Sequence, residues 1–464
     1  MVAPKAFFAK KDQPKLFAPK VKTLMANLAA EAKPGDQGVV VSSLTSAAPK
    51  KLILGVLPDR VSRYNCAARP DPIQKVIQSG LNGRDKKIAL VVVLDHEAHL
   101  IPALNAVGRA FPIFTRRSET QPNPKLQIVV LGPKGEALKI SNHVKELIHT
   151  SREVAALVDT PPSELDPEAF AARARDLVGD LEGVHVEEIV GEQLKERGLD
   201  GIWSVGKAAT KAPRMLVATY TPAHSSGKHV ALVGKGVTFD TGGLHLKARG
   251  MMETMKSDMG GAAAVAGAFR VLVEAKCPHQ LSLVMCLAEN AIGPTSYKPD
   301  DILTLHSGRT VEINNTDAEG RLLLADGVSW AARVLKADTI IDAATLTGAQ
   351  LIATGMMHAA VISNDEALEI LMVAAGQASG DLVHPLPFAP ELYKAEFKSP
   401  VADMRNSVKN RNNAQTSCAA QFIYNHLEDA GVKWAHVDLA GPSFRNDRGT
   451  GYGVALLVEA VGRI

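Results

Sequence analysis

The second half of the chain contains apolar runs that are too evenly hydrophobic to be strands with one face in water. They are RMLVATY (214–220), HVALVGKGVTFD (229–240), LSLVMCLAEN (281–290), TIIDAATLTG (339–348) and WAHVDLAG (434–441). Strands of this kind need cover on both faces, as in an α/β sheet packed between helices. The stretches at 260–275 and 322–335 are the expected helices.

A second α/β pattern precedes this region. Strands are expected at 50–57, 86–95 and 125–132, and helices at 72–80 and 99–111. Apolar residues at helical spacing from Val144 to Val158 predict one long helix, which Pro161 and Pro162 end. We therefore expect a smaller N-terminal α/β domain at 1–140 and a connecting helix at 141–160. A larger C-terminal domain at 161–464 would have a central, mostly parallel or mixed sheet flanked by helices.

Composition and charge limit which binding partners and which cellular compartment are expected. The net charge of +3 over 464 residues argues against nucleic acid or a membrane as the main partner. Four cysteines without a CxxC pair predict free, mostly buried thiols in a reducing compartment. No apolar run spans a bilayer and the N-terminus has no apolar signal region, so a cytoplasmic protein is expected. The six lysines of the first 22 residues are interpreted as a solvated tail rather than a binding arm.

Charged residues gather where the predicted strands and helices of the second domain meet. They are Lys235, Asp240 and Lys247 around VGKGVTFDTGG, Asp258 in MKSDMGGAAAV, and Asp317, Glu319 and Arg321 in NNTDAEGRLLLADG. Ligands of such sheets bind at the carboxyl ends of strands, so these side chains are expected at one site. Asp258 and Asp317 could instead be helix caps, and Arg321 could simply pair with its acidic neighbours.

The residue types point to a metal site. A buried Lys235 needs a partner or loses its proton. If Asp317-Ala318-Glu319 is extended, both carboxylates point to one side, and a divalent cation would relieve their repulsion. Carboxylates suit zinc, manganese or magnesium. A nucleotide-binding loop is disfavoured, because Phe239 breaks GxGxxG and Gly236 follows Lys235 where a Walker motif needs Ser or Thr.

These three segments together resemble the leucine aminopeptidase (cytosol aminopeptidase) family, over residues from about 155 to 464. SGDLVHPL and ADMRNSV are most similar to its probable aminopeptidase-like branch. The resemblance implies a catalytic metallopeptidase domain at 161–464 with two divalent ions, zinc or manganese with magnesium as a further candidate. Lys235, Asp240, Asp258 and Glu319 would hold one ion, and Asp240, Asp317 and Glu319 the other. Two metal ions about 3.5–4 Å apart repel each other, and carboxylates that bind both ions reduce this repulsion.

The resemblance also assigns the remaining roles. Lys247 and Arg321 would be the catalytic pair, with Lys247 stabilising the oxyanion and Arg321 holding a bicarbonate that carries the proton. The implied substrates are peptides, cut after a leucine-like N-terminal residue, and the implied assembly is a homohexamer. The substrate side-chain pocket would contain Met255, Thr345, Gly348 and Ala440, for which ordinary core packing is an equal alternative.

Two departures from the family pattern stand at His245 and at Ser443-Phe444. His245 could be a surface histidine, an extra ligand or a substrate contact, and the first is favoured. Two other functions are weighed: a catalytically weak member with a binding or architectural role, and a dinuclear phosphate hydrolase. The complete set of implied ligands argues against the first, and a lysine ligand argues against the second.

Overall fold

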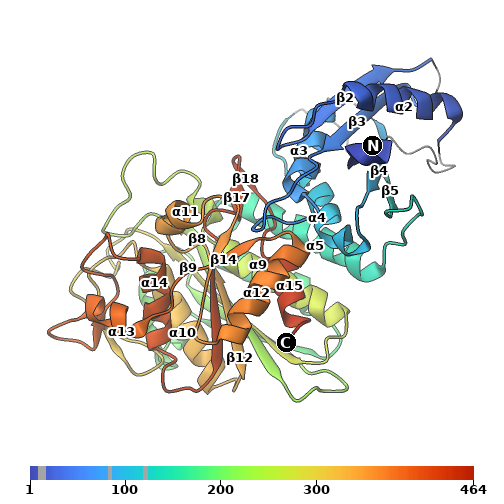
Figure 1. The fold of residues 1–464 in the computed structure, drawn as a ribbon. Coiled ribbons are helices and arrows are strands. Elements are labelled where there is room, and N and C mark those ends of the chain that lie inside the picture. The colour runs from blue at the N-terminus through green and yellow to red at the C-terminus, as the bar shows by residue number, and fades with distance from the viewer. Residues whose placement is uncertain (9–16, 47, 82–85, 119–123) are drawn as a thin grey trace. The chain divides into compact units, whose positions relative to one another are not determined.

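The computed structural model describes residues 1–8, 17–46, 48–81, 86–118 and 124–464 (Figure 1). It contains two compact units, and each is described by itself. The first unit is Met1–Arg152 with Gly376–Leu382, and the second is Glu153–Ala375 with Val383–Ile464. The first boundary along the chain falls inside α5 (Asn142–Asp159), the long helix that the apolar spacing predicts.

The first unit is built on a five-stranded sheet in the order β2-β3-β1-β4-β5. Strands β1, β3, β4 and β5 run parallel, and β2 pairs antiparallel with β3. Its elements are β1 (Val2–Pro4), α1 (Lys5–Phe8), α2 (Pro19–Glu31), β2 (Val39–Leu44), β3 (Lys51–Leu57), α3 (Pro70–Gly80), β4 (Lys87–Val93), η1 (Glu97–His99), α4 (Leu100–Ala110) and β5 (Lys125–Leu131).

The prediction of a solvated N-terminal tail was wrong for the residues that can be described. Val2 and Ala3 are buried because β1 lies between β3 and β4, in the middle of the sheet. Phe7 and Phe8 are buried too, and α2 packs against β2 and β3. The three-residue strand is too short for an apolar pattern to reveal it. Residues 9–16, which carry three of the six lysines, lie outside the described residues.

The second unit has a mixed eight-stranded sheet in the order β14-β13-β16-β12-β8-β9-β7-β6. Its central strands β16, β12, β8 and β9 are parallel, whereas β13, β7 and β6 each pair antiparallel with an inner neighbour. The strands are β6 (Val184–Val190), β7 (Arg214–Tyr220), β8 (His229–Asp240), β9 (Gln280–Asn290), β12 (Thr339–Ala344), β13 (Ala359–Ser363), β14 (Val383–Pro385) and β16 (Lys433–Asp438).

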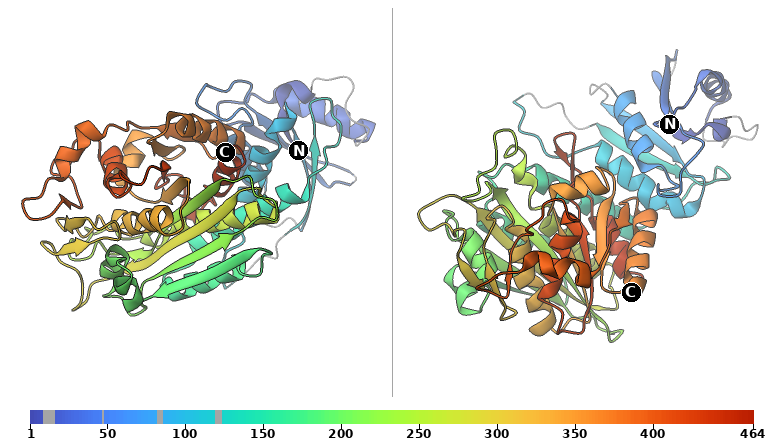
Figure 2. Two further views of the ribbon diagram at one scale, coloured as in Figure 1. Left: turned by 90° about the horizontal axis from the view of Figure 1, so that it is seen from below. Right: turned by 60° about the vertical axis from the view of Figure 1, so that its left-hand side comes forward.

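Helices cover both faces of this sheet, as the evenly apolar strands require (Figures 1 and 2). One layer contains α6, α9 and α15 and the other α8, α10 and α14, as their mutual contacts show. The helices are α6 (Pro167–Val178), α7 (Glu192–Glu196), α8 (Asp200–Gly206), α9 (Gly260–Glu274), α10 (Gly320–Arg333), α11 (Gly348–Ala353), α12 (Glu366–Ser379), α13 (Pro390–Tyr393), α14 (Gln415–Asn425) and α15 (Val454–Val461).

Smaller elements complete the second unit. They are η2 (Met255–Ser257), η3 (Lys394–Phe397), a sheet of β10 (Ile302–Thr304), β11 (Thr310–Glu312) and β15 (Met404–Arg405), and a ribbon of β17 (Phe444–Arg445) and β18 (Arg448–Gly449). The five predicted strands of this unit are all present, but the run at 339–348 ends as a strand at Ala344 and enters α11 at Gly348. The four cysteines are free and buried, as predicted.

Among the helices that can be described, none is long and apolar enough to cross a membrane.

Candidate active site

Strand β8 places Lys235 and Asp240 at the site through an irregularity in its pairing. Along β9, Val237 pairs with Ala288 but Asp240 pairs with Asn290, so β8 contains one extra residue there. In a regular strand, side chains five residues apart point to opposite faces. The inserted residue is a β-bulge, and it allows both side chains to face the same site.

Asp258 follows η2 and lies two residues before α9. It could have been a helix cap, but its carboxylate faces Lys235 instead. The Lys235 ammonium lies 2.7 Å from Asp258 Oδ1 and 2.9 Å from Glu319 Oε1, and it donates to the Thr345 carbonyl at 2.8 Å. Thr345 Oγ1 also donates to Asp258 Oδ1 at 2.9 Å. Lys235 therefore joins β8, the start of α9, the start of α10 and the end of β12.

The segment before α10 is a turn rather than an extended strand, which corrects the expectation for Asp317 and Glu319. Glu319 has helical backbone angles and stands at the N-terminus of α10. The two carboxylates still converge, because the turn and the first helical residue bring them together. Gly320 is required here for space: a Cβ at this position would lie 2.5 Å from Cε of Lys235.

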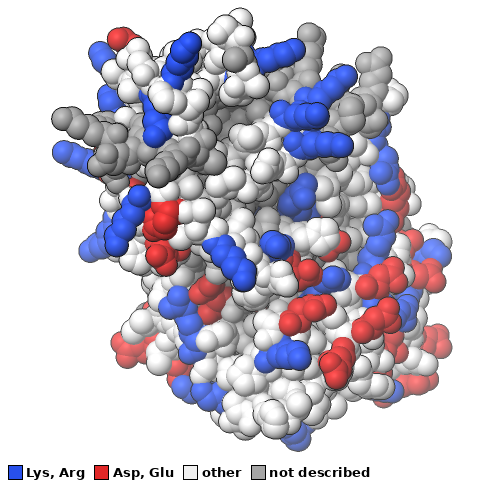
Figure 3. Space-filling model, turned by 90° about the vertical axis from the view of Figure 1, so that its right-hand side faces the viewer, with Lys and Arg blue, Asp and Glu red and all other residues white. Residues whose placement is uncertain are grey.

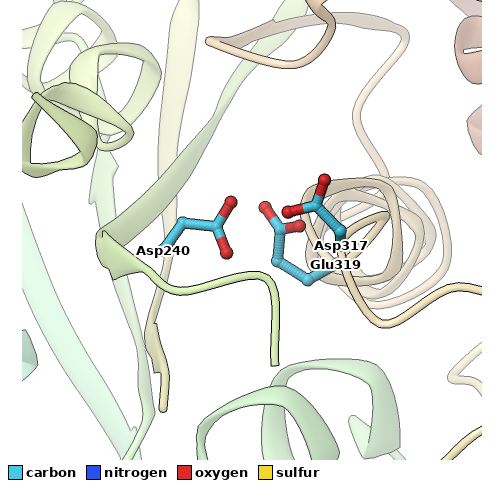
Figure 4. A group of neighbouring side chains, drawn as sticks. All are labelled: Asp240, Asp317 and Glu319. Atoms are coloured by element: carbon cyan, nitrogen blue, oxygen red, sulfur yellow. The ribbon is translucent and has the colours of Figure 1, made fainter. Parts of the chain in front are cut away.

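Oxygens of Asp240, Asp317 and Glu319 lie within 4.8 Å of one another. Figure 4 shows the three carboxylates pointing toward one another, one from the end of β8 and two from the approach to α10. The Lys247 ammonium lies 2.7 Å from Asp240 Oδ2 and 2.6 Å from Asp317 Oδ1. The structure thus brings together the four predicted acids and both predicted lysines.

Burial and charge oppose each other at this site. Burial alone would lower the pKa of Lys235, but the carboxylates of Asp258, Glu319 and Asp240 outweigh it and raise the pKa. The pKa of Lys247 is raised by Asp240 and Glu319 in the same way. Burial, and then repulsion by Asp240, raises the pKa of both Asp317 and Glu319. The four carboxylates therefore need nearby cations in order to stay ionised, and the two lysine ammonium groups supply only two positive charges.

The donor set fits divalent metal ions. Four carboxylates against two ammonium groups leave a surplus of negative charge, and Asp258 Oδ2 is buried without a hydrogen-bond partner in the described part of the chain. Carboxylate oxygens are ligands that zinc, manganese and magnesium accept. An amine ligates only when neutral, so a metal at Lys235 would displace its proton, as metals do at other protonated ligands.

Arg321 lies in the first turn of α10, as predicted. One guanidinium nitrogen donates to the Asn406 carbonyl at 3.0 Å, while Nε is buried and has no partner among the described residues. Burial lowers the pKa of Arg321 to about 10, against the opposing effect of Glu319. Its two acidic neighbours face the lysines, so Arg321 keeps donors for an anion.

Of the four predicted pocket residues, Thr345 and Met255 are hydrogen-bonded to these groups. Thr345 is hydrogen-bonded to Asp258 and Lys235, and Met255 opens η2, which ends at that aspartate. Gly348 starts α11 and faces open space, since a Cβ there would meet no atom within 4 Å. The Ala440 amide donates to Asp438 Oδ1 at 3.3 Å. Asp438 also accepts from Leu346 and Thr347, so one buried carboxylate ties together the loops of Thr345 and Ala440.

His245 is not the isolated surface histidine that we favoured. Its ring is solvent-exposed, but Nδ1 accepts a hydrogen bond from the Thr316 amide at 3.1 Å. Its own amide donates to Thr316 Oγ1 at 2.8 Å. These bonds fasten the loop that carries Lys247 to the turn that carries Asp317. Ser443, at the second departure from the family pattern, is buried. Its hydroxyl would lie 3.3 Å from a Cβ placed on Gly260, so it packs closely against the start of α9.

Two asparagines that support the site were missed in the sequence. Asn290 Nδ2 donates to Asp240 Oδ1 at 2.8 Å and to the Thr316 carbonyl at 3.1 Å. Asn406 is fully buried; its Oδ1 accepts from the amides of Asn314 and Asn315, and its Nδ2 donates to the Asn315 carbonyl. Asn290 ends an apolar strand, a position that could have flagged it. Asn406 lies far away in sequence and offered no such signal.

Comparison with known proteins agrees with this geometry. A family model described as cytosol aminopeptidase family, catalytic domain, matches residues 153–458, and an M17 aminopeptidase N-terminal domain 2 model matches 13–120. A mouse protein named "Probable aminopeptidase NPEPL1" is 43% identical over 419 residues, which is 88% of this chain and 79% of that protein.

Solved structures extend the similarity over the whole chain. The apo leucyl aminopeptidase of Trypanosoma cruzi has a TM-score of 0.91 at 40% identity, covering 99% of this chain and 91% of that one. The Trypanosoma brucei enzyme in complex with bestatin has a TM-score of 0.91 at 38% identity, covering 100% and 91%.

The fold and the clustered carboxylates, taken with these similarities, define a metallo-aminopeptidase, a hydrolase that removes N-terminal residues from peptides. The chain belongs to the cytosol aminopeptidase family.

Proposed function

We propose that the site holds two divalent ions. Lys235, Asp240, Asp258 and Glu319 would hold one, and Asp240, Asp317 and Glu319 the other. The observation that carries this proposal is the convergence of four carboxylates on two lysines, with oxygens of three carboxylates within 4.8 Å of one another. The bound ions would activate water for attack on the scissile carbonyl and receive the free α-amine of the substrate.

Two side chains of this chain would then act on the reacting groups. Lys247, which faces Asp240 and Asp317, would turn its ammonium to the oxyanion of the tetrahedral intermediate. Arg321 would hold a small anion, bicarbonate, between its free Nε and the first amides of α10. The chemistry that a bicarbonate held by Arg321 would supply is proton transfer between the attacking water and the leaving amine.

The substrate side chain would lie against Met255, Thr345, Gly348 and Ala440. Open space above Gly348 and a flexible thioether at Met255 suit an unbranched or γ-branched aliphatic side chain, so a leucine-like residue is the proposed preference. Zinc or manganese, with magnesium less favoured, are the proposed metals. A cytoplasmic homohexamer is the proposed form, with 161–464 as the catalytic metallopeptidase domain, 141–160 as its connecting helix and 1–140 as the N-terminal domain.

The test is hydrolysis of a panel of aminoacyl-amides by the purified full-length protein. We expect activity with added Mn²⁺ or Zn²⁺, loss after chelation, and none on N-acetylated substrates. Glu319→Ala should abolish turnover and lower the bound metal measured by elemental analysis, because it removes a shared ligand. Full activity of the Glu319→Ala protein would refute the two-metal proposal.

A further inference from the structure

The two parts of the chain carry opposite charge. Residues 1–152 contain 24 Lys and Arg against 11 Asp and Glu, a net charge of +13. The remaining residues contain 28 against 38, a net charge of −10. The whole-chain value of +3 hides this asymmetry. On the face drawn in Figure 3, the visible charged side chains of the first unit are mainly Lys and Arg. A charge difference of this size between two halves indicates an anionic partner for the basic one.

The topology of the first unit collects lysines at one end of its sheet. Strands β3, β4 and β5 are parallel through β1, so their first residues lie at the same end. Those first residues are Lys51, Lys87 and Lys125, and Lys50 and Lys86 precede two of them. We call these five residues the lysine edge. Four are exposed and Lys51 is half-exposed.

Among the residues that can be described, the lysine edge contains repelling charges and no acidic partner that would offset them. Lys87 and Lys125 are direct partners across β4 and β5, and like charges in that relation are destabilising. Within the described residues, none of the five lysines forms an ion pair. Asp59 and Asp95 follow the opposite ends of β3 and β4, whereas Asp85 precedes Lys86 in the sequence and lies outside the described residues. From β3 to β5 the sheet has three strand spacings of about 4.8 Å, which give the edge a width of about 14 Å.

Exposed apolar side chains lie at the same end. Leu44 ends β2 opposite Lys51 and is 80% exposed. Ile113, 38% exposed, lies in the connection from α4 that must return to this end before β5 begins. Nucleic acid is the less suitable partner, because its phosphate backbone is bound by cationic and polar groups and would leave the exposed Leu44 without a contact. Lysines surrounding apolar side chains are typical of surfaces that lie on anionic lipid, where the apolar groups enter the headgroup region.

We propose that the lysine edge, with Leu44 and Ile113, is a docking surface for an anionic lipid bilayer. Binding would be peripheral, through lysine contacts with negative headgroups and shallow insertion of the two apolar side chains. This differs from the expectation of no membrane partner, which depended on the whole-chain charge and on apolar run length. It requires nothing of the catalytic groups and is independent of the proposed peptidase mechanism.

The experiment is co-sedimentation of the full-length protein with vesicles of phosphatidylcholine alone and of phosphatidylcholine with about 30% phosphatidylserine. We expect binding to the anionic vesicles only, weakened by salt. Each lysine near an anionic surface contributes roughly a fivefold gain in affinity, so Lys86→Gln/Lys87→Gln should bind about 30-fold more weakly. The matched control is Lys134→Gln/Lys139→Gln, which removes two exposed lysines beyond the other end of β5.

The proposal fails if anionic vesicles bind no more protein than neutral ones, or if the control pair loses as much binding as the edge pair. Leu44→Ser should weaken vesicle binding at every salt concentration, and an unchanged Leu44→Ser protein would overturn the choice of lipid. Competition by duplex DNA that binds more tightly than the vesicles would also overturn it, in favour of a nucleic-acid surface. Unchanged aminopeptidase activity of each variant verifies that the protein is folded.

Discussion

Replacing Lys235 by Met tests whether this lysine neutralises the acids of the site when no metal is bound. The side chain is 3% exposed, and its ammonium lies within 3 Å of carboxylate oxygens of Asp258 and Glu319. Methionine keeps the length of the side chain but removes the charge. Two buried carboxylates would then lose their common cation, and removing one partner of a buried pair costs about 3–5 kcal/mol.

The variant and the parent protein should be unfolded thermally in the presence of a chelator and again with excess Mn²⁺. All three tryptophans, Trp203, Trp330 and Trp434, lie in the second unit, so their fluorescence reports the unfolding of that unit alone. Because this unit is longer than 250 residues, the loss should lower its midpoint by roughly 5–8 °C without metal. With Mn²⁺ the difference should shrink, because a divalent ion replaces the missing positive charge.

Lys211→Met is the matched control, because Lys211 pairs with Glu168 on the surface of the same unit. Exposed pairs contribute little, so its midpoint should hardly move in either condition. The reasoning is refuted if Lys235→Met is as stable as the parent in chelator. It is equally refuted if the loss is the same size with and without Mn²⁺, since Lys235 would then be a structural residue unconnected to a metal site.

Three further results are expected. Arg321→Ala should slow turnover while bound metal, measured by elemental analysis, stays near the parental level, because the proposed partner of Arg321 is an anion rather than a metal; a large loss of metal would contradict its assignment. Gly348→Val should reduce kcat/KM for leucyl-amide more than for alanyl-amide, since its side chain would fill open space, and equal losses would remove Gly348 from the pocket. Burial lowers the pKa of His426 to about 3, so the unfolded chain binds more protons below pH 6.5 and stability must fall as the pH falls. His426→Gln should therefore lose about 2 kcal/mol less than the parent between pH 7 and pH 5, by denaturant titration, and an identical pH dependence would show that His426 does not stay neutral.

The sequence predicted most of the second unit because its local signals agree with one another. Apolar strands without a polar face require a covered sheet, and the helix boundaries follow local chemistry: Asp166 caps α6 by accepting from the Ala169 amide. The charged residues of the site could be found because Lys235 interrupts an apolar run, Asp240 ends it, and most of the others gather just before apolar helices. Their partners were harder to see: Asn406 reaches the site across some 90 residues of sequence, and no short pattern records such a contact.

The first unit was predicted less well for a different physical reason. Its β1 strand has three residues, and pattern-based reasoning needs more than one alternation to separate a strand from a tail. Whole-chain charge also misled, because it averages a basic unit with an acidic one. Both errors come from features that acquire meaning only after the strands are paired and their ends are aligned.

The extra residue in β8 between Val237 and Asp240 has a consequence for how this sequence can vary. Many substitutions of Thr238 or Phe239 would leave the strand direction intact, whereas deleting either residue would restore regular pairing and turn the Asp240 carboxylate to the other face of the sheet. The number of residues between Lys235 and Asp240 must therefore stay fixed if both side chains are to reach the site. Between Lys235 and Asp240, the protein should tolerate substitutions far better than insertions or deletions.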